Sequence, residues 1–431
     1  MPGSAWRKRN LLTPKFKPVD EQIAHLKKGA AEIIREEDLK AKLEQSATTG
    51  KPLRVYLGVD PTAPDIHLGH TVVLRKLKHF QDMGHTAIFL IGDFSAMIGD
   101  PTGQSETRPP LTREQVDANA QTYLAQVYKI LDREKTEVRY NSEWLGKMSS
   151  YDVVRLCGHY RLARMLERED FRSRLDKNLP ISVHELLYPL LTAYDAVALH
   201  SDVELGATEQ KFNMLVHREI QREYGQTSEV LLTMPILVGL DGERKMSKSL
   251  GNYVGITETP GQMFGKLMSI SDDLMWSYYD LLTDFGPHVV LRVREEVRTG
   301  VLHPKRAKME LAHNIVAGFH GEEAARKAAE EFDKIYSKRQ LPSEMTEQAV
   351  SRKEMIKEYA VHDGLMKLSR LIDRWELAKS KAEAERLISQ GAVEWDSKRI
   401  TDVTFVINLN EAGDHILRVG KKPPMLVRIM A

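Results

Sequence analysis

The sequence predicts a mixed α/β protein with three folded parts: a parallel-sheet domain, an α-helical domain and a small α+β module. The apolar runs LRVYLGV (53–59) and TAIFLIGD (86–93) flank an amphipathic helical pattern, which predicts a β-α-β unit and therefore a parallel sheet. Residues 259–338 contain amphipathic helical segments and no strand signal. From residue 363 the pattern changes again, to two short helices and a strand, a turn and a strand.

The composition is that of a globular protein. The 431 residues are 42% apolar and 29% charged, which excludes a disordered or fibrous chain and predicts about two to four domains. The formal charge of +1 neither favours nor excludes a nucleic-acid partner. The single cysteine, Cys157, excludes a disulfide framework. The basic start of the chain has no apolar stretch of signal-peptide length, and no run approaches the roughly 20 apolar residues of a membrane span, so we expect a cytoplasmic protein.

The elements follow in order along the chain. We expect a helix at 21–45, the strand at 53–59, a helix at 71–84 that Gly84 ends, the strand at 86–93, helices from 112 to about 178, a buried helix at 184–200, a loop entering a helix at 206–225 and a strand at 234–242. The corresponding parts are a basic tail (1–20), the sheet domain (21–250), the helical domain (251–338), a polar linker (339–362) and the C-terminal module (363–431). In this module, Ser380 and Glu383 form a capping box and Gly391 ends the helix.

The loop DPTAPDIHLGH (60–70) connects the first strand to its helix. In open α/β sheets ligands bind at this position, and the free N–H groups of a helix N-terminus favour an anion. His67 and His70 can donate hydrogen bonds to phosphate oxygens, and Gly69 lets a base or ribose approach the backbone. The alternatives are a metal-binding pair or two surface histidines. The strand-to-helix position favours phosphate over both.

A second polar loop, GERKMSKS (242–249), follows the apolar segment PILVGL. Lys245 and Lys248 can stabilise the charge that develops on a leaving pyrophosphate. Alone, this loop would be read as a solvated basic turn. Together with the first loop it predicts a nucleotide site with histidines at one end of the triphosphate and lysines at the other. The Walker A, dinucleotide-binding and zinc-hydrolase motifs are absent from the sequence.

These residues carry a family resemblance. HLGH (67–70) resembles the His-Ile-Gly-His motif of class I aminoacyl-tRNA synthetases, and Lys245–Ser249 matches their KMSKS motif. The segments VYLGVDPTAPDIHLGH, IGDFSAMIGDPTG and HELLYPLLTAYD resemble bacterial tyrosyl-tRNA synthetases from about residue 20 to the end. The resemblance implies a Rossmann-like catalytic domain, a helical domain that binds the anticodon side of tRNA, and a small RNA-binding module like that of a ribosomal protein.

The resemblance also implies a tyrosine pocket. Tyr56 and Asp195 would hold the phenol, because a buried carboxylate and a second hydroxyl would be left unpaired by a ligand that lacks this group. Asp100 and Tyr188 would hold the ammonium group. The alternatives are an Asp195 paired with a basic neighbour, a turn-forming Asp100 and a packed Tyr188. The complete set predicted to bind tyrosine is Tyr56, Asp60, Asp100, Tyr188, Thr192 and Asp195.

For ATP, the resemblance implies that Glu209 holds the ribose beside Gln210 and that Leu237 and Val238 lie against adenine, although the apolar pair also fits a buried strand. The predicted ATP-binding set is Gly69, His70, Glu209, Gln210, Leu237, Val238, Lys245 and Lys248. Three positions depart from the family pattern. Glu209 replaces Asp, Thr192 replaces Gln, and Gln104 replaces a basic residue, so we expect Arg108 to carry more of the tRNA or phosphate contact.

The expected reaction has two steps. The carboxylate of tyrosine attacks the α-phosphate of ATP, with Mg²⁺ on the phosphates, and the terminal adenosine of tRNA then attacks the adenylate. The predicted catalytic residues are Thr62, His67, His70, Lys245 and Lys248. The predicted tRNA-binding residues of the C-terminal module are Lys367, Arg370, Arg374, Lys379 and Lys381, for which a solvated helix face is the alternative. A homodimer is implied by the resemblance, and no membrane contact is expected.

Three rival functions remain open from sequence. A tryptophanyl enzyme would share both nucleotide motifs, but Tyr56 with Asp195 favours a ligand that bears a hydroxyl group. A small-molecule nucleotidylyltransferase can share the H-x-G-H loop but has little use for an RNA-binding module. An RNA-binding protein derived from an inactive synthetase would be expected to lose HLGH and KMSKS first, and both are intact.

Overall fold

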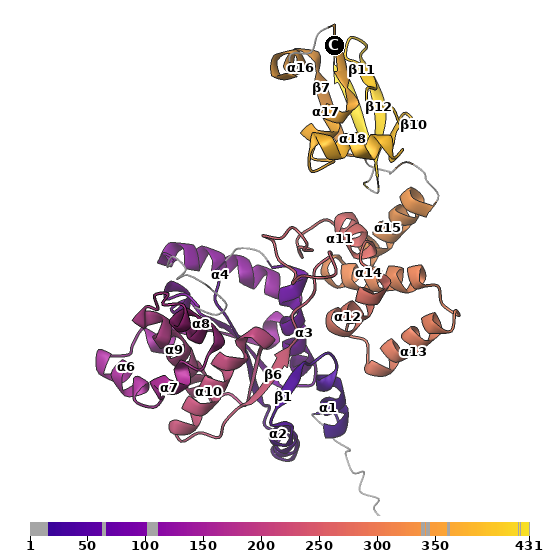
Figure 1. Ribbon diagram of the computed structural model, residues 1–431. Coiled ribbons are helices and arrows are strands. Elements are labelled where there is room, and N and C mark those ends of the chain that lie inside the picture. The colour runs from indigo at the N-terminus through magenta and orange to yellow at the C-terminus, as the bar shows by residue number, and fades with distance from the viewer. Residues whose placement is uncertain are drawn as a thin grey trace, which may run out of the picture. The chain divides into compact units, whose positions relative to one another are not determined.

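The computed structural model describes residues 16–62, 66–100, 111–337, 341, 345–359, 363–420, 422 and 424–430 (Figure 1). The chain divides into two compact units, Met1–Ala325 and Arg326–Ala431. None of the helices in the described ranges is long and apolar enough to cross a membrane.

The first unit is built on a six-stranded sheet in the order β1-β6-β5-β2-β3-β4. Its strands are β1 (Glu32–Ile34), β2 (Arg54–Val59), β3 (Thr86–Ile91), β4 (Thr136–Tyr140), β5 (Val203–Ala207) and β6 (Val230–Met234). Only the edge strand β1 is antiparallel to its neighbour, and the other pairs are parallel. All residues of β6, and all but the first of β3, are buried, as is usual for parallel strands that are covered on both faces.

The crossover helices define the position of the site. Helix α3 joins β2 to β3, whereas α10 joins β5 to β6 in the opposite direction along the sheet. Right-handed crossovers in opposite directions place their helices on opposite faces, so the strand order reverses between β2 and β5.

The helices of this region are α1 (Val19–Lys27), α2 (Glu36–Thr49), α3 (Leu68–Asp82), α4 (Arg113–Val127), α5 (Ser142–Leu145), α6 (Ser150–Cys157), α7 (Leu162–Met165), α8 (Glu169–Asp176), α9 (Val183–Leu199) and α10 (Lys211–Glu223), with 3₁₀ turns at Ser95–Met97, Arg133–Lys135 and Thr208–Gln210.

A helical region follows the sheet, as predicted for 259–338. It contains α11 (Pro260–Met268), α12 (Asp272–Leu282), α13 (Pro287–Arg298), α14 (Pro304–His320) and α15 (Glu322–Phe332), with a π-helical turn at Asp333–Ser337. Proline opens α11, α13 and α14, where its fixed φ suits the first helical position and its missing N–H has no partner to lose. Helices α11 and α12 pack on α14, and α12 also packs on α3.

The second unit has its own sheet in the order β10-β9-β12-β13-β7 and a separate β11-β8 pair. Its elements are β7 (Glu347–Ser351), α16 (Arg352–Tyr359), β8 (Leu365–Lys367), α17 (Leu368–Arg374), α18 (Lys381–Ser389), β9 (Val393–Trp395), β10 (Lys398–Ile400), β11 (Val406–Asn408), β12 (Gly413–Val419) and β13 (Met425–Met430). Its core includes buried residues of α17, α18 and the strands. The Ser380 hydroxyl caps α18 as predicted, and Gly391 follows the helix with a φ of +67°.

Several elements differ from the expectation. Strand β4 lies where only helices were expected. It was missed because TEVRY is half-buried at the sheet edge and has no apolar run. The short β1 interrupts the helix expected at 21–45. The strand expected at 234–242 lies at 230–234 instead. Residues 235–240 form a loop in which Val238 makes a single bridge to Lys245.

The second unit also begins earlier than the expected boundary at residue 363. Strand β7 and helix α16 lie in the segment 339–362, which was expected to be a linker. Strand β7 pairs in parallel with β13, the last strand of the chain. Its polar sequence EQAVS resembles a connector because only Val350 is buried there.

Candidate active site

A cavity of about 550 Å³ opens at the carboxyl ends of β2 and β5, where the strand order reverses. Helices α3, α4, α9 and α10 contribute to its walls together with the segment 235–247. The predicted site residues that line it are Tyr56, Asp60, Thr62, His67, Gly69, His70, Asp100, Tyr188, Thr192, Asp195, Glu209, Gln210, Leu237 and Lys245. This is the position at which open α/β sheets bind ligands.

The HLGH motif forms the N-terminus of α3. His67 is the cap residue, and its Nδ1 accepts a hydrogen bond from the Gly69 N–H (3.1 Å). The Nδ1 of His70 accepts from the His67 N–H (3.2 Å), and the centres of the two rings are 3.9 Å apart. A Cβ atom on Gly69 would lie 2.9 Å from the His67 ring. The glycine therefore makes room for the imidazole of His67. An approach of a nucleotide to Gly69 stays a prediction.

The KMSKS loop is fixed against the same helix end. The Met246 N–H donates to the Leu237 carbonyl (2.8 Å), and the Cβ of Met246 lies 3.7 Å from the position of a Cβ on Gly69. The chain after the loop returns to α3, where the Leu68 N–H donates to the Val254 carbonyl (2.9 Å). Two motifs about 180 residues apart in the sequence therefore form one wall of the cavity.

The two histidines are held in their neutral form. Burial lowers the pKa of His67 to about 3, with further contributions from His70 and Lys248. Burial, and then Lys248, lowers the pKa of His70 to about 4. Lys248 is thus close enough to influence both rings, although it does not line the cavity. Near pH 7 each imidazole carries one N–H.

Further residues surround the nucleotide part of the cavity. The Lys245 ammonium forms an ion pair with Glu209 (3.3 Å). Gln210 Oε1 accepts a hydrogen bond from the Ala207 N–H (3.2 Å). Leu237 is buried and lines the cavity, whereas Val238 does not line it and accepts a hydrogen bond from the Tyr278 hydroxyl at its carbonyl (2.8 Å). Of the predicted apolar pair, only Leu237 therefore faces the cavity.

The carboxyl group of Asp195 is buried on α9. Trp144 Nε1 donates to Asp195 Oδ1 (2.7 Å), and Asn141 Nδ2 donates to Asp195 Oδ2 (3.4 Å). Burial raises the pKa of Asp195 to about 8 in the ligand-free protein. The expected alternative, a pairing with Lys or Arg, is replaced by these two neutral donors.

Asp60 lies in the same network. The Tyr188 hydroxyl donates to Asp60 Oδ2 (2.9 Å), and the Ser95 hydroxyl donates to Asp60 Oδ1 (2.7 Å). Asn141 Nδ2 also donates to the Ser95 hydroxyl (2.9 Å). Tyr188 is therefore a polar member of the site in addition to a packed aromatic residue.

Tyr56 and Thr192 meet at His217 of α10. The Tyr56 hydroxyl lies 3.4 Å from His217 Nδ1, and the Thr192 hydroxyl lies 3.0 Å from His217 Nε2. The Thr192 hydroxyl also donates to the Tyr188 carbonyl (2.9 Å). This hydroxyl is therefore already engaged within the protein.

Four further residues of the site were not predicted from the sequence: Ser95, Asn141, Trp144 and His217. Asn141 and Trp144 directly follow β4, so the rule that polar residues at strand ends form sites would have found them if β4 had been predicted. Ser95 likewise follows β3. His217 had no signal, because one polar residue at a buried helical position is indistinguishable from a core histidine.

The remaining predicted residues lie elsewhere. Arg108 and Gln104 fall outside the described residues. Of the five basic residues of the second unit, four are exposed and Arg370 is half-buried, with its guanidinium donating to the Tyr359 carbonyl (3.1 Å). Arg374 pairs with Glu358, and Lys381 lies 3.6 Å from Glu385.

Comparisons with known proteins identify the family of the chain. Residues 48–337 match the profile of the family described as tRNA synthetases class I (W and Y). The tyrosine–tRNA ligase of Oleidesulfovibrio alaskensis is 52% identical over 404 residues, which cover 94% of this chain and 98% of the relative. The tyrosine–tRNA ligase of Moorella thermoacetica is 51% identical, with 94% and 95% covered.

The chain is also similar to solved structures of tyrosyl-tRNA synthetases. The tyrosyl-tRNA synthetase of Archaeoglobus fulgidus, in complex with L-tyrosine, has a TM-score of 0.57 and 25% identity, and the match covers 72% of this chain and all of the other. A C-terminally truncated mitochondrial tyrosyl-tRNA synthetase of Aspergillus nidulans has a TM-score of 0.62 at 20% identity, with 73% and 94% covered, and shows the shared fold.

Proposed function

The chain belongs to the class I tRNA synthetases for tryptophan and tyrosine, and its activity is that of a tyrosine–tRNA ligase; from this premise we propose how its cavity carries out the two steps of the reaction. The observation that carries the proposal is that one cavity joins the buried pair Tyr56 and Asp195 to the HLGH and KMSKS wall.

The phenol of the substrate binds at Tyr56 and Asp195. Both side chains are buried and line the cavity, so a side chain that enters must satisfy their polar groups. A phenol can donate to or accept from a carboxyl group, and it therefore pairs with Asp195 in either protonation state. Phenylalanine would offer neither group a hydrogen-bond partner, and the indole of tryptophan can only donate.

The ammonium group of tyrosine binds near Asp60, Asp100 and Tyr188. The hydrogen bond from Tyr188 supports this role, because it holds the Asp60 carboxylate facing the cavity. Thr192 contributes less than a glutamine would, since its hydroxyl already contacts Tyr188 and His217. The departure at Thr192 thus transfers the ammonium contact to the two aspartates.

ATP binds as its magnesium complex along the HLGH and KMSKS wall. The neutral imidazoles of His67 and His70 donate hydrogen bonds to phosphate oxygens, with Thr62 beside them, and Lys245 and Lys248 neutralise the charge that develops on pyrophosphate. Gln210 and Leu237 border the adenosine, and Glu209 holds the ribose. Because Glu209 pairs with Lys245 here, ATP has to separate this ion pair as it binds.

No general base is required in the first step. The carboxylate of tyrosine is ionised near pH 7 and attacks the α-phosphate in line, which releases pyrophosphate. The protein contributes position and charge stabilisation. In the second step the terminal hydroxyl of tRNA attacks the adenylate carbonyl and releases AMP.

The second unit binds tRNA. Its exposed Lys367 and Lys379 are the residues most available to phosphate, whereas Arg374 and Lys381 have acidic neighbours with which RNA must compete. Arg108, outside the described residues, is proposed to contact the tRNA end. Because the substrates of this reaction are cytoplasmic, we expect the protein in the cytoplasm.

The protein acts as a homodimer. Four large apolar side chains are more than half exposed on α6, on α7 and at the start of α9: Tyr151, Val154, Leu162 and Val183. These exposed apolar side chains support an interaction surface on this part of the first unit, and a second copy of the chain is the proposed occupant.

Exchange of labelled pyrophosphate into ATP tests the proposed function. Tyrosine should support exchange, whereas tryptophan and phenylalanine should not. Exchange that depends on tryptophan, or no exchange with tyrosine, would overturn the assignment of the pocket.

A further inference from the structure

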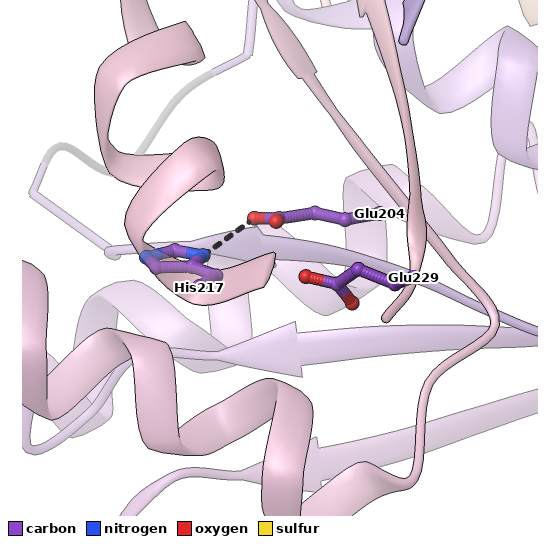
Figure 2. A group of neighbouring side chains, drawn as sticks. All are labelled: Glu204, His217 and Glu229. Carbon is purple, nitrogen blue, oxygen red and sulfur yellow. Dashed lines mark hydrogen bonds and ion pairs between the residues drawn. The ribbon is translucent and has the colours of Figure 1, made fainter. Parts of the chain in front are cut away.

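Three buried titratable side chains lie next to the tyrosine pocket and have no part in the reaction described above. Glu204 lies on β5, His217 on α10 and Glu229 directly before β6 (Figure 2). Figure 2 shows that the three side chains point toward one another from these separate elements. One potential ligand atom from each lies within 4.8 Å of the other two, and all three residues are buried.

The carboxylates of this Glu-His-Glu cluster lack a positive partner. Glu204 Oε2 and Glu229 Oε1 are buried without a hydrogen-bond partner. Among the described residues, no Lys or Arg side chain forms an ion pair with either carboxylate. Two buried carboxylates need either a proton or a cation, because an uncompensated buried charge costs several kcal/mol.

The atoms around the cluster hold its members in a ligating orientation. His217 Nε2 lies 3.0 Å from the Thr192 hydroxyl, which leaves Nδ1 toward Glu204 (2.9 Å). The Ser201 hydroxyl donates to Glu229 Oε2, which leaves Oε1 toward the cluster. Metal sites are built in this way, with the second ring nitrogen and the second carboxylate oxygen held by outer partners.

We propose that Glu204, His217 and Glu229 bind one divalent transition-metal ion of the Zn²⁺ class. Two carboxylates and a neutral imidazole balance the charge of such an ion, and one nitrogen with two oxygen ligands is a donor set that zinc accepts. Binding would draw the three ligand atoms together to about 3.4 Å, the spacing in a tetrahedral zinc site. Glu204 and His217 line the cavity, which provides a path of entry.

The ion would be structural. It would tie β5, α10 and the start of β6 together at the wall that carries Tyr56, whose hydroxyl lies 3.4 Å from His217 Nδ1. The ligands come from three elements, so binding of the metal links separate parts of the sheet domain.

The test is titration of the full-length, chelator-stripped protein with Zn²⁺ by calorimetry, and with Co²⁺ by visible absorption. We expect one ion per chain, and tetrahedral Co²⁺ bands that Zn²⁺ displaces. Glu229→Gln should weaken binding at least about 100-fold, and Ser201→Ala by about 10-fold, since outer partners typically contribute 10- to 100-fold. Circular dichroism shows whether each variant is folded.

A matched control removes a different histidine–carboxylate pair. His415 contacts Asp396 (2.7 Å) at the surface of the second unit, and His415→Gln should bind Zn²⁺ as the wild type does. The proposal is overturned if the wild type shows no one-to-one binding tighter than about 10 μM, or if His415→Gln and not Glu229→Gln loses the ion. In the first case a proton shared between Glu204 and Glu229 replaces the metal. Both readouts are independent of tyrosine activation.

Discussion

Trp144 determines how the carboxyl group of Asp195 faces the substrate. Its indole N–H donates to Asp195 Oδ1 (2.7 Å), so the group is oriented before tyrosine binds. We expect Trp144→Phe to raise the KM for tyrosine by about 5- to 150-fold, the equivalent of about 1–3 kcal/mol for a hydrogen bond to a buried polar group, with a smaller change in kcat.

Pyrophosphate exchange at varied tyrosine concentration measures this effect. Trp276→Phe is the control, because Trp276 stacks on Tyr279 in the helical region and does not line the cavity. An unchanged KM in Trp144→Phe would mean that Asp195 is oriented by other contacts.

Asp195 should also make stability depend on pH. Its folded-state pKa of about 8 is above the usual value near 3.9, so the folded protein retains a proton that the unfolded chain releases. The stabilisation from Asp195 is therefore complete below about pH 4. As the pH rises from there through about 8, this stabilisation is lost, by up to about 1.4 kcal/mol per pH unit.

Asp195→Asn removes this titration. Urea denaturation gives the free energy of unfolding of the variant minus that of the wild type. This difference should become more positive at each step from pH 5.5 to 7.5. Asp20→Asn, at an exposed position, should run parallel to the wild type. A constant difference between Asp195→Asn and the wild type over this range would contradict the raised pKa.

Lys248 acts on charge that develops during the reaction. Lys248→Ala should lower the rate of adenylate formation by about 100-fold or more and leave the KM for tyrosine within about twofold. Lys211→Ala removes a half-buried lysine that pairs with Glu32 and serves as the control. A large rise in KM with an unchanged rate would show that Lys248 contributes to substrate binding instead.

At the level of elements, the N-terminus of α3 depends on a glycine. Alanine at position 69 favours the helix by up to about 1 kcal/mol, but its Cβ would lie 2.9 Å from the His67 ring and displace it. Gly69→Ala should therefore change the free energy of unfolding by less than about 1 kcal/mol and still reduce adenylate formation. Gly265→Ala, in a helix where a Cβ meets nothing within 4 Å, should keep full activity. Equal activity of the two variants would contradict the positioning of His67.

The elements also differ in how well the sequence predicts them. Strands β2 and β3 were predicted because they are buried apolar runs, and the HLGH loop could be placed from them. Strand β4 was missed because TEVRY is only five residues long and has no apolar run, although its β-branched and aromatic residues alternate with charged ones. Without β4, Asn141 and Trp144 had no strand end to follow, so both hydrogen-bond donors to Asp195 were missed. His217 required the packing of α10 against α9, which is a long-range contact that no local pattern contains.

At the level of the whole molecule, the first unit alone should form tyrosyl-adenylate, whereas charging of tRNA should also need the second unit. The first unit contains the entire cavity, whereas β7 pairs with β13 inside the second unit. A chain that ends at residue 337 should keep tyrosine-dependent pyrophosphate exchange and lose most tRNA charging. A chain that ends at residue 362 should be less soluble, because β7 and α16 lose their core. Loss of exchange in the first truncation would show that the second unit supports the cavity.

A crystal structure with a non-hydrolysable tyrosyl-adenylate analogue tests the central claim most directly. The phenol should lie between Tyr56 and Asp195, and the group that replaces the phosphate should lie against His67 and His70, with Lys245 and Lys248 closing over it. An analogue bound outside this cavity, or bound with its phenol away from Tyr56 and Asp195, would contradict the account.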